Sequence, residues 1–175
     1  MKTKKRTKRS DRTEMKRVIV IGCPGSGKST LARELQKKTG LPLISLDNIW
    51  WKADRTHITR EEFDARMKNV LETDEWIIEG SYSRTFEPRF RACDTVILLD
   101  YDTGVCMQGI IDRIGQTRPD IPWTEQTLDP ELAELVRTYR ERNGPALSDL
   151  FQRYADRDIH IFHTRAEAEA WMETL

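Results

Sequence analysis

The segment with the clearest chemistry is a glycine-rich run that ends in Lys28 and Ser29. From Gly22 to Ser29 it matches the pattern G-x-x-x-x-G-K-[ST] at every defined position. Glycines permit backbone conformations in which several N–H groups point inward and form a nest for phosphate oxygens. The lysine supplies a cation for the β- and γ-phosphates, and the serine supplies a hydroxyl ligand for Mg²⁺. The alternative is a glycine-rich turn that binds nothing.

This run also has the neighbours that a phosphate-binding loop needs. Residues 18–21 are apolar and β-branched, which predicts a strand buried on both faces, and residues 30–39 predict a helix with Gly40 as its C-cap. The positive end of that helix would face the same anion. We therefore expect an ATP-binding P-loop. The residues predicted to bind ATP are Gly22, Cys23, Pro24, Gly25, Ser26, Gly27, Lys28, Ser29 and Thr30.

Strand and helix signals alternate from Arg17 onward, which predicts an α/β sheet of parallel strands. Further strands are expected at residues 43–46, 76–79, 95–100 and 159–163. Capping boxes predict helices after Thr59 and after Thr164. A helix should also begin at Pro130 behind its cap Asp129 and stop near residues 143–144, with a separate helix over 145–155.

Three features resemble the adenylate-kinase-related branch of P-loop kinases: the P-loop, Asp47 after the second predicted strand, and residues 76–84. Within that branch the sequence is most similar to a group named topology-modulation proteins. The stretches that match this group are LDNIWW at 46–51, GSYSRT at 80–85 and QTRPD at 116–120. The resemblance covers about residues 17–175. It implies a three-layer P-loop NTPase fold with a five-stranded parallel sheet in the order 2-3-1-4-5 and a lid segment.

The resemblance also implies transfer of the ATP γ-phosphoryl group, with Mg²⁺, to a small metabolite or nucleotide-like acceptor. Ser29 and Glu79 would hold the metal, although this branch more often has Asp at the second position. Glu79 could instead be a buried charge paired with a neighbour. Arg84 stands where an acceptor-binding arginine is expected, and its alternative is a surface salt bridge.

Two arginines fall where such kinases carry a mobile lid. Residues 115–129 are polar and broken by prolines, which predicts a loop, and Arg113 and Arg118 lie at its start. Guanidinium groups suit the charge that develops on the transferred phosphoryl oxygens, so the resemblance makes both arginines catalytic together with Lys28. The alternative is that they are solvated in an exposed loop.

Asp47 is the candidate for the acceptor side. As a carboxylate at the end of a strand it could orient an acceptor hydroxyl or take its proton, or it could be a helix N-cap. Trp50 and Trp51 follow it and either line an acceptor pocket or belong to the core. No arginine occurs here until Arg55, which is a departure from nucleoside monophosphate kinases and argues against an AMP-like acceptor.

Composition limits the remaining choices. The chain has 175 residues, 38% of them hydrophobic, enough for one domain, and no apolar run approaches the roughly 20 residues that span a bilayer. Three widely spaced cysteines predict reduced thiols and a cytoplasmic protein. Residues 1–16 form a predicted basic, disordered arm before a domain over 17–175. The second functional hypothesis is that the protein is a nucleotide-dependent module that binds nucleic acid or protein through this arm. The rest of the chain carries more acidic than basic residues and would repel a polyanion, which argues against this hypothesis.

Overall fold

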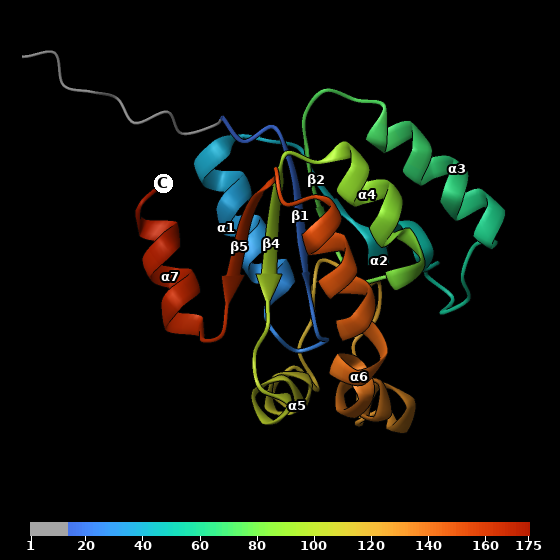
Figure 1. Ribbon diagram of the computed structural model, residues 1–175. Coiled ribbons are helices and arrows are strands. Elements are labelled where there is room, and N and C mark those ends of the chain that lie inside the picture. Colours follow the sequence, from blue (N-terminus) through green and yellow to red (C-terminus); the bar gives the residue numbers. More distant parts are fainter. Residues whose placement is uncertain (1–13) are drawn as a thin grey trace, which may run out of the picture.

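The computed structural model describes residues 14–175 and has a five-stranded parallel sheet with helices on both faces (Figure 1). The strands are β1 (Arg17–Gly22), β2 (Leu43–Ser45), β3 (Trp76–Glu79), β4 (Thr95–Leu99) and β5 (Asp158–Phe162). Their order β2-β3-β1-β4-β5 confirms the predicted topology. Val18 in β1 pairs with Ile77 in β3 and with Thr95 in β4, so β1 lies at the centre. Residues 1–13 of the predicted arm lie outside the described residues.

Helices connect the strands of the sheet. They are α1 (Lys28–Thr39), α2 (Leu46–Trp50), α3 (Arg60–Leu71), α4 (Phe86–Ala92), α5 (Thr103–Asp112), α6 (Pro130–Arg153) and α7 (Arg165–Glu173), with a 3-10 turn, η1 (Ser83–Thr85). The capping box of Thr164 and Glu167 is confirmed in full, and Thr59 and Asp129 accept from the first turns of their helices. Among residues 14–175, no helix is both long and apolar enough to cross a bilayer.

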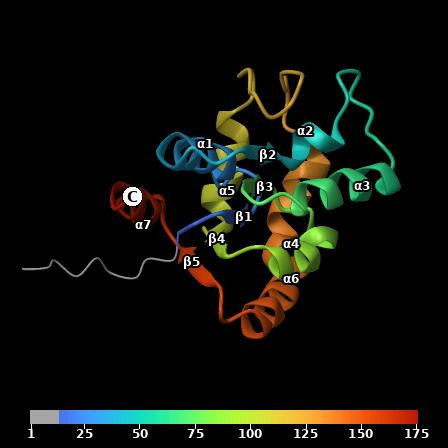
Figure 2. The ribbon, with the colours of Figure 1, turned by 90° about the horizontal axis from the view of Figure 1, so that it is seen from above.

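Alternate residues of the central strand feed two separate cores. Val18 and Val20 face α1, α5 and α7, whereas Ile19 and Ile21 face α3 and α4. Figures 1 and 2 show these two helical layers on opposite sides of the sheet. This arrangement explains why residues 18–21 of β1 are all apolar, rather than apolar at every second position.

The expected strand bounds hold to within one residue, but two expected boundaries were wrong in ways that change the local structure. The second strand ends at Ser45 instead of residue 46, and the chain turns at once into α2, so Asp47 lies in the first turn of a helix. The predicted break at residues 143–144 does not occur, because α6 runs through Pro145 without interruption. A proline inside a helix costs about 3 kcal/mol. Burial of Leu147 and Leu150 in the second core offsets that cost.

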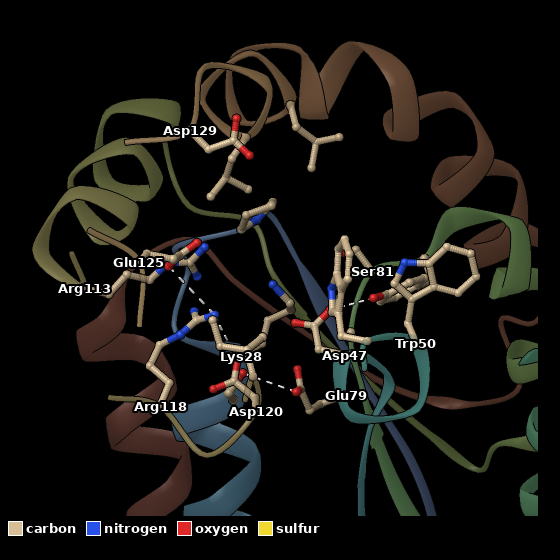
Figure 3. Close-up of a pocket in the computed structure, with 18 of the residues that line it drawn as sticks. Lys28, Asp47, Trp50, Glu79, Ser81, Arg113, Arg118, Asp120, Glu125 and Asp129 are labelled. Carbon is tan, nitrogen blue, oxygen red and sulfur yellow. Dashed lines mark hydrogen bonds and ion pairs between the residues drawn. The ribbon is translucent and has the colours of Figure 1, made fainter. Parts of the chain in front are cut away.

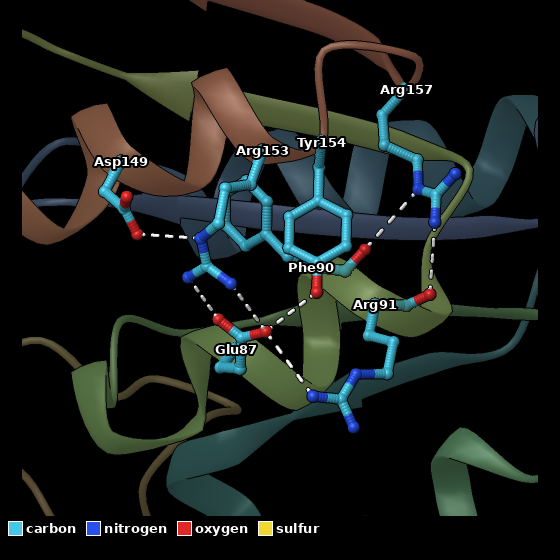
Figure 4. Close-up of polar contacts among 7 residues, drawn as sticks. All are labelled: Glu87, Phe90, Arg91, Asp149, Arg153, Tyr154 and Arg157. Atoms are coloured by element: carbon cyan, nitrogen blue, oxygen red, sulfur yellow. Dashed lines mark hydrogen bonds and ion pairs between the residues drawn. The ribbon is translucent and has the colours of Figure 1, made fainter.

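A polar cluster joins α4 to the end of α6 (Figure 4). The carboxylate of Glu87 accepts hydrogen bonds from Arg153 Nη1 at 3.0 Å and from the hydroxyl of Tyr154 at 2.7 Å. These bonds, with Arg153 the first cause, lower the pKa of Glu87 to about 2. Arg157 donates to the carbonyl groups of Phe90 and Arg91. The cluster fixes α4 against α6 on the second face of the sheet.

Candidate functional site

The P-loop lies between the carboxyl end of β1 and the first turn of α1. Gly25 and Gly27 have φ angles of 81° and 93°, in the left-handed region that favours glycine. A Cβ atom on Gly25 would lie 2.0 Å from the carbonyl oxygen of Cys106 in α5. Glycine is therefore required here for α5 to pack directly on the loop, and this packing holds the loop next to the segment that follows α5.

Lys28 is the first residue of α1, and its side chain lies in the middle of a cavity (Figure 3). Its Nζ donates to the carbonyl oxygen of Cys23 at 3.0 Å, within the P-loop itself. Burial lowers the pKa of Lys28, and the charges of Glu79 and Asp47 oppose that shift. The side chain is half-buried and its ammonium group faces the cavity, so an anion bound there would lie directly beside a cation.

Ser29 and Glu79, the two predicted metal ligands, lie side by side. The Ser29 hydroxyl donates to Glu79 Oε1 at 3.2 Å, and the Ser45 hydroxyl donates to the same oxygen at 2.6 Å. Burial raises the pKa of Glu79, while Lys28 acts in the opposite direction. One hydroxyl and one carboxylate fit Mg²⁺, which keeps several waters and takes further oxygens from phosphates. Within the described residues no group of three or more His, Cys, Asp or Glu could hold a metal, so the nucleotide would complete the coordination.

The cavity around Lys28 has a volume of about 750 Å³. The P-loop, α2, the loop after β3, the segment between α5 and α6, and the first half of α6 form its walls. Figure 3 shows Lys28 between Arg113 and Arg118 on one side and Asp47 with Trp50 on the other. The structure therefore brings seven of the predicted site residues to one space, although the sequence separates them by up to 94 positions: Pro24, Lys28, Ser29, Asp47, Glu79, Arg113 and Arg118.

Asp47 lines this cavity from the first turn of α2. It is not the N-cap of that helix, because Ser45 holds that position. Its Oδ1 accepts a hydrogen bond from the hydroxyl of Tyr82 at 2.6 Å. Burial and the charge of Asp47 raise the pKa of Tyr82, so the phenol stays protonated and remains a donor. The carboxylate is thereby held in one orientation toward the cavity.

Arg113 and Arg118 line the opposite wall, beside acidic side chains of their own segment. Arg113 Nε lies 3.2 Å from Glu125 Oε2, and Arg118 Nη2 lies 3.5 Å from Asp120 Oδ2. Burial, followed by the charge of Arg118, lowers the pKa of Arg113. Two guanidinium groups are thus concentrated in one place, each beside a carboxylate. An anion entering the cavity would compete with these carboxylates for them.

Arg84 does not lie in the cavity. Its Nη1 contacts both carboxylate oxygens of Asp64 in α3 at 2.7 Å, and 45% of its side chain is exposed. This is the surface salt bridge that the sequence left as the alternative. The reason is geometric: the 3-10 turn over Ser83–Thr85 points the side chain at position 84 away from the sheet edge.

Arg89 in α4 is the arginine that sequence reasoning missed. It is fully buried and donates to the carbonyl oxygens of Thr85, Gly80 and Ser81 at 2.8 to 3.2 Å. Burial lowers its pKa to about 10, so it remains charged at neutral pH. Its burial could have been predicted from its spacing, because Arg89 lies on the same face of the helix as the apolar residues Phe86 and Phe90. Arg89 fixes the loop after β3, which carries Tyr82.

Cys23, a predicted P-loop residue, has a structural role. It is buried, and its thiol contacts the carbonyl of Val136 at 3.9 Å. Contact with the Cys106 thiol and burial raise the pKa of Cys23, so it is a packed thiol rather than a reactive one. Asp120, Glu125 and Trp123 also line the cavity and were missed, because their loop has no periodic pattern that indicates which side chains point inward.

Comparison with known proteins agrees with this geometry. A family model described as an AAA domain matches residues 18–118, more than half of the chain. The adenylate kinase of Thermotoga neapolitana is 28% identical over 104 residues, which cover 58% of this chain and 46% of that enzyme. The adenylate kinase of Thermotoga maritima is 27% identical over the same length. The chain thus matches about half the length of these curated relatives.

Solved structures show the same fold. Shikimate kinase from Bacteroides thetaiotaomicron superposes with a TM-score of 0.61 at 19% identity, covering 91% of this chain and 96% of that one. Shikimate kinase from Acinetobacter baumannii, in complex with shikimate, gives a TM-score of 0.57 at 16% identity, covering 92% and 91%. These likenesses confirm the P-loop architecture. With the family model spanning the P-loop, Glu79 and Arg113, the protein belongs to the AAA domain family of P-loop proteins.

Proposed function

We propose that this protein is a kinase that transfers the γ-phosphoryl group of ATP to a hydroxyl group of a small acceptor. One observation carries the proposal: a single cavity holds Lys28 between two arginines on one wall and an oriented carboxylate, Asp47, on the other. A protein that only binds nucleotide needs Lys28 and the arginines, but it does not need a carboxylate held on the opposite wall. The adenylate kinase and shikimate kinase relatives support the same class of reaction.

The nucleotide half of the cavity has the groups that phosphoryl transfer requires. The P-loop N–H groups and Lys28 would bind the β- and γ-phosphates, and Arg113 and Arg118 would approach the γ-phosphoryl from the opposite wall. Ser29 and Glu79 would hold Mg²⁺ with the phosphate oxygens. When bound, the metal would neutralise part of the negative charge on these phosphates.

Asp47 supplies the acceptor half. The acceptor hydroxyl would donate a hydrogen bond to its carboxylate, which Tyr82 holds in place. In the transfer a bond forms between the acceptor oxygen and the γ-phosphorus, and the bond from that phosphorus to the β–γ bridging oxygen breaks. ADP leaves with the electron pair, and the acceptor proton passes to Asp47. Because the transition state is loose, positioning and charge stabilisation account for most of the catalysis.

The test is an ADP-release assay with Mg²⁺ and ATP against pools of metabolites and nucleosides. We expect one pool to raise ADP release and to yield a phosphorylated product detectable by mass spectrometry. Asp47→Asn should abolish this increase while leaving ATP binding intact in calorimetry. Equal ADP release with and without every pool, accompanied by free phosphate, would instead identify an ATP hydrolase.

A further inference from the structure

Two tryptophans on the acceptor side have no role in the core. Trp51 follows α2, and Trp123 lies in the segment between α5 and α6; both are only half-buried, and both line the cavity. Neither belongs to either hydrophobic core. Trp50 differs, since it packs into the second core and its ring contacts Phe63 and Tyr82. Large aromatic surfaces left beside a cavity are typical of ligand contacts.

The two indoles come from distant segments and meet at the rim. Their ring centroids are 5.3 Å apart with an interplanar angle of 88°, an edge-to-face contact. Trp51 is held by its bridge to His57, which closes a short hairpin. The turn of that hairpin places Arg55 at a φ angle of 68°, unusual for a residue other than glycine, and its guanidinium lies 5.7 Å from the centroid of the Trp123 ring. Both indoles are therefore positioned by specific contacts.

The arginines near this wall are unsuited to a phosphate on the acceptor. Arg84 pairs with Asp64 outside the cavity, and Arg89 gives its donors to backbone carbonyl groups. Arg55 and Arg142 line the cavity but are exposed at its rim. The half-buried guanidinium groups in the cavity, Arg113 and Arg118, lie on the side of Lys28 opposite Asp47. The acceptor wall thus combines aromatic rings and the carboxylate of Asp47 with arginines only at its exposed rim, where solvent screens their charge, and this set favours an acceptor without a phosphate.

We infer that the acceptor is a heteroaromatic alcohol without a phosphate group, of the nucleoside type. Its ring would stack on one of the two indoles, Trp51 or Trp123, and meet the other edge-on, because the indoles are nearly perpendicular. Its hydroxyl would reach Asp47, which lies one helical turn before Trp51. Aromatic side chains stack on any planar base, because every base has a π-face, so stacking depends little on which base is bound. This inference rests on the proposed kinase function and specifies its substrate class.

The test compares matched acceptors in the ADP-release assay with the full chain. Thymidine and adenosine are the ring-bearing alcohols, ribose is the ring-free control, and thymidine monophosphate and AMP are the phosphorylated controls. We expect at least one nucleoside to be used with a kcat/KM at least about tenfold above that of ribose and of its own monophosphate, the size expected for stacking of one base.

Variants separate stacking from folding. Trp123→Leu should raise the KM for the nucleoside about tenfold with kcat and the KM for ATP nearly unchanged, and Trp123→Phe should restore most of the loss because a ring is retained. The matched control is Trp171→Leu. Trp171 contacts Phe162 in the core that contains Val18 and Val20, and it does not line this cavity. Calorimetry of thymidine with the nucleotide site filled by ADP gives a readout independent of turnover.

The outcomes distinguish the two proposals. Equal use of ribose and nucleosides, a preference for the monophosphates, or an unchanged KM in Trp123→Leu would overturn the aromatic acceptor while the kinase stands. Absence of ATP binding, or of any acceptor-dependent ADP release, would overturn the kinase proposal and this inference with it.

Discussion

The hydroxyl of Tyr82 donates to Oδ1 of Asp47 at 2.6 Å and joins the loop after β3 to the first turn of α2. The two residues are 35 positions apart, and Tyr82 also stacks on Phe63 with ring centroids 5.3 Å apart. The contact therefore links the second core directly to the carboxylate that faces the cavity. A change at either residue should affect the acceptor step without affecting the nucleotide.

Asp47→Asn should lower kcat by about 10²-fold or more, because an amide cannot take the acceptor proton. Tyr82→Phe keeps the packing on Phe63 but removes the hydrogen bond, and a smaller loss of about tenfold is expected. Steady-state kinetics with the identified acceptor measure both. An ATP KM that rises as much as kcat falls would show that Asp47 serves nucleotide binding instead.

Lys28→Ala should abolish ATP binding measurable by calorimetry while the melting temperature stays close to that of the wild type. The Lys28 side chain lines the cavity and belongs to neither hydrophobic core, so its removal costs little stability but eliminates the main cation for the phosphates. The control is Lys37→Ala, an exposed position in α1 paired with Glu34. Retained ATP affinity in Lys28→Ala would refute the phosphate site.

Arg113→Ala and Arg118→Ala should each lower kcat by on the order of 10²-fold, with a smaller change in ATP affinity. Both guanidinium groups already contact carboxylates, so their strongest interaction should be with charge that develops during transfer. Arg137→Ala, on the exposed side of α6, is the control. Parallel losses in affinity and turnover would mean that the two arginines bind ground-state nucleotide.

Arg89→Met should reduce the free energy of unfolding by about 3 kcal/mol, because buried carbonyl groups of Gly80 and Ser81 would lose a charged donor. Urea denaturation measures the loss. Arg91→Met, at an exposed position of the same helix, should change it by less than about 0.5 kcal/mol. Similar effects of the two substitutions would show that Arg89 contributes only as a packed side chain in α4.

Glu87 should contribute stability that depends on pH. Its pKa is about 2 in the folded protein, below the roughly 4.3 of an unperturbed glutamate. The contribution is therefore complete above about pH 4.3 and disappears as the pH falls toward 2. Melting temperatures of the wild type and Glu87→Gln should differ at pH 7 and converge at pH 2, with Glu141→Gln as an exposed control. A difference that stays constant with pH would exclude the ion pair as its source.

Much of the fold was predictable because local patterns encode it. Continuous apolar runs such as residues 18–21 specify buried parallel strands, and all five strands lie within one residue of their predicted bounds. The P-loop pattern carries its own backbone geometry, with glycine at the left-handed positions. Because the carboxyl ends of parallel strands share one edge, Glu79 could be expected near Ser29, and the structure places them in contact.

Only the tertiary structure decided which arginine serves the loop after β3. Both Arg84 and Arg89 follow β3 closely, and the sequence does not indicate which of them is buried. A 3-10 turn directs Arg84 toward Asp64, whereas Arg89 lies on the face of α4 that packs into the core. The pairing of Trp51 with Trp123 was equally hidden, because it depends on how an irregular segment folds over α2. The sequence by itself determined the phosphate-binding loop and the positions of the strands, and its resemblance to P-loop kinases implied their order. Contacts between distant loops, which no local periodicity encodes, decided the shape and chemistry of the acceptor wall.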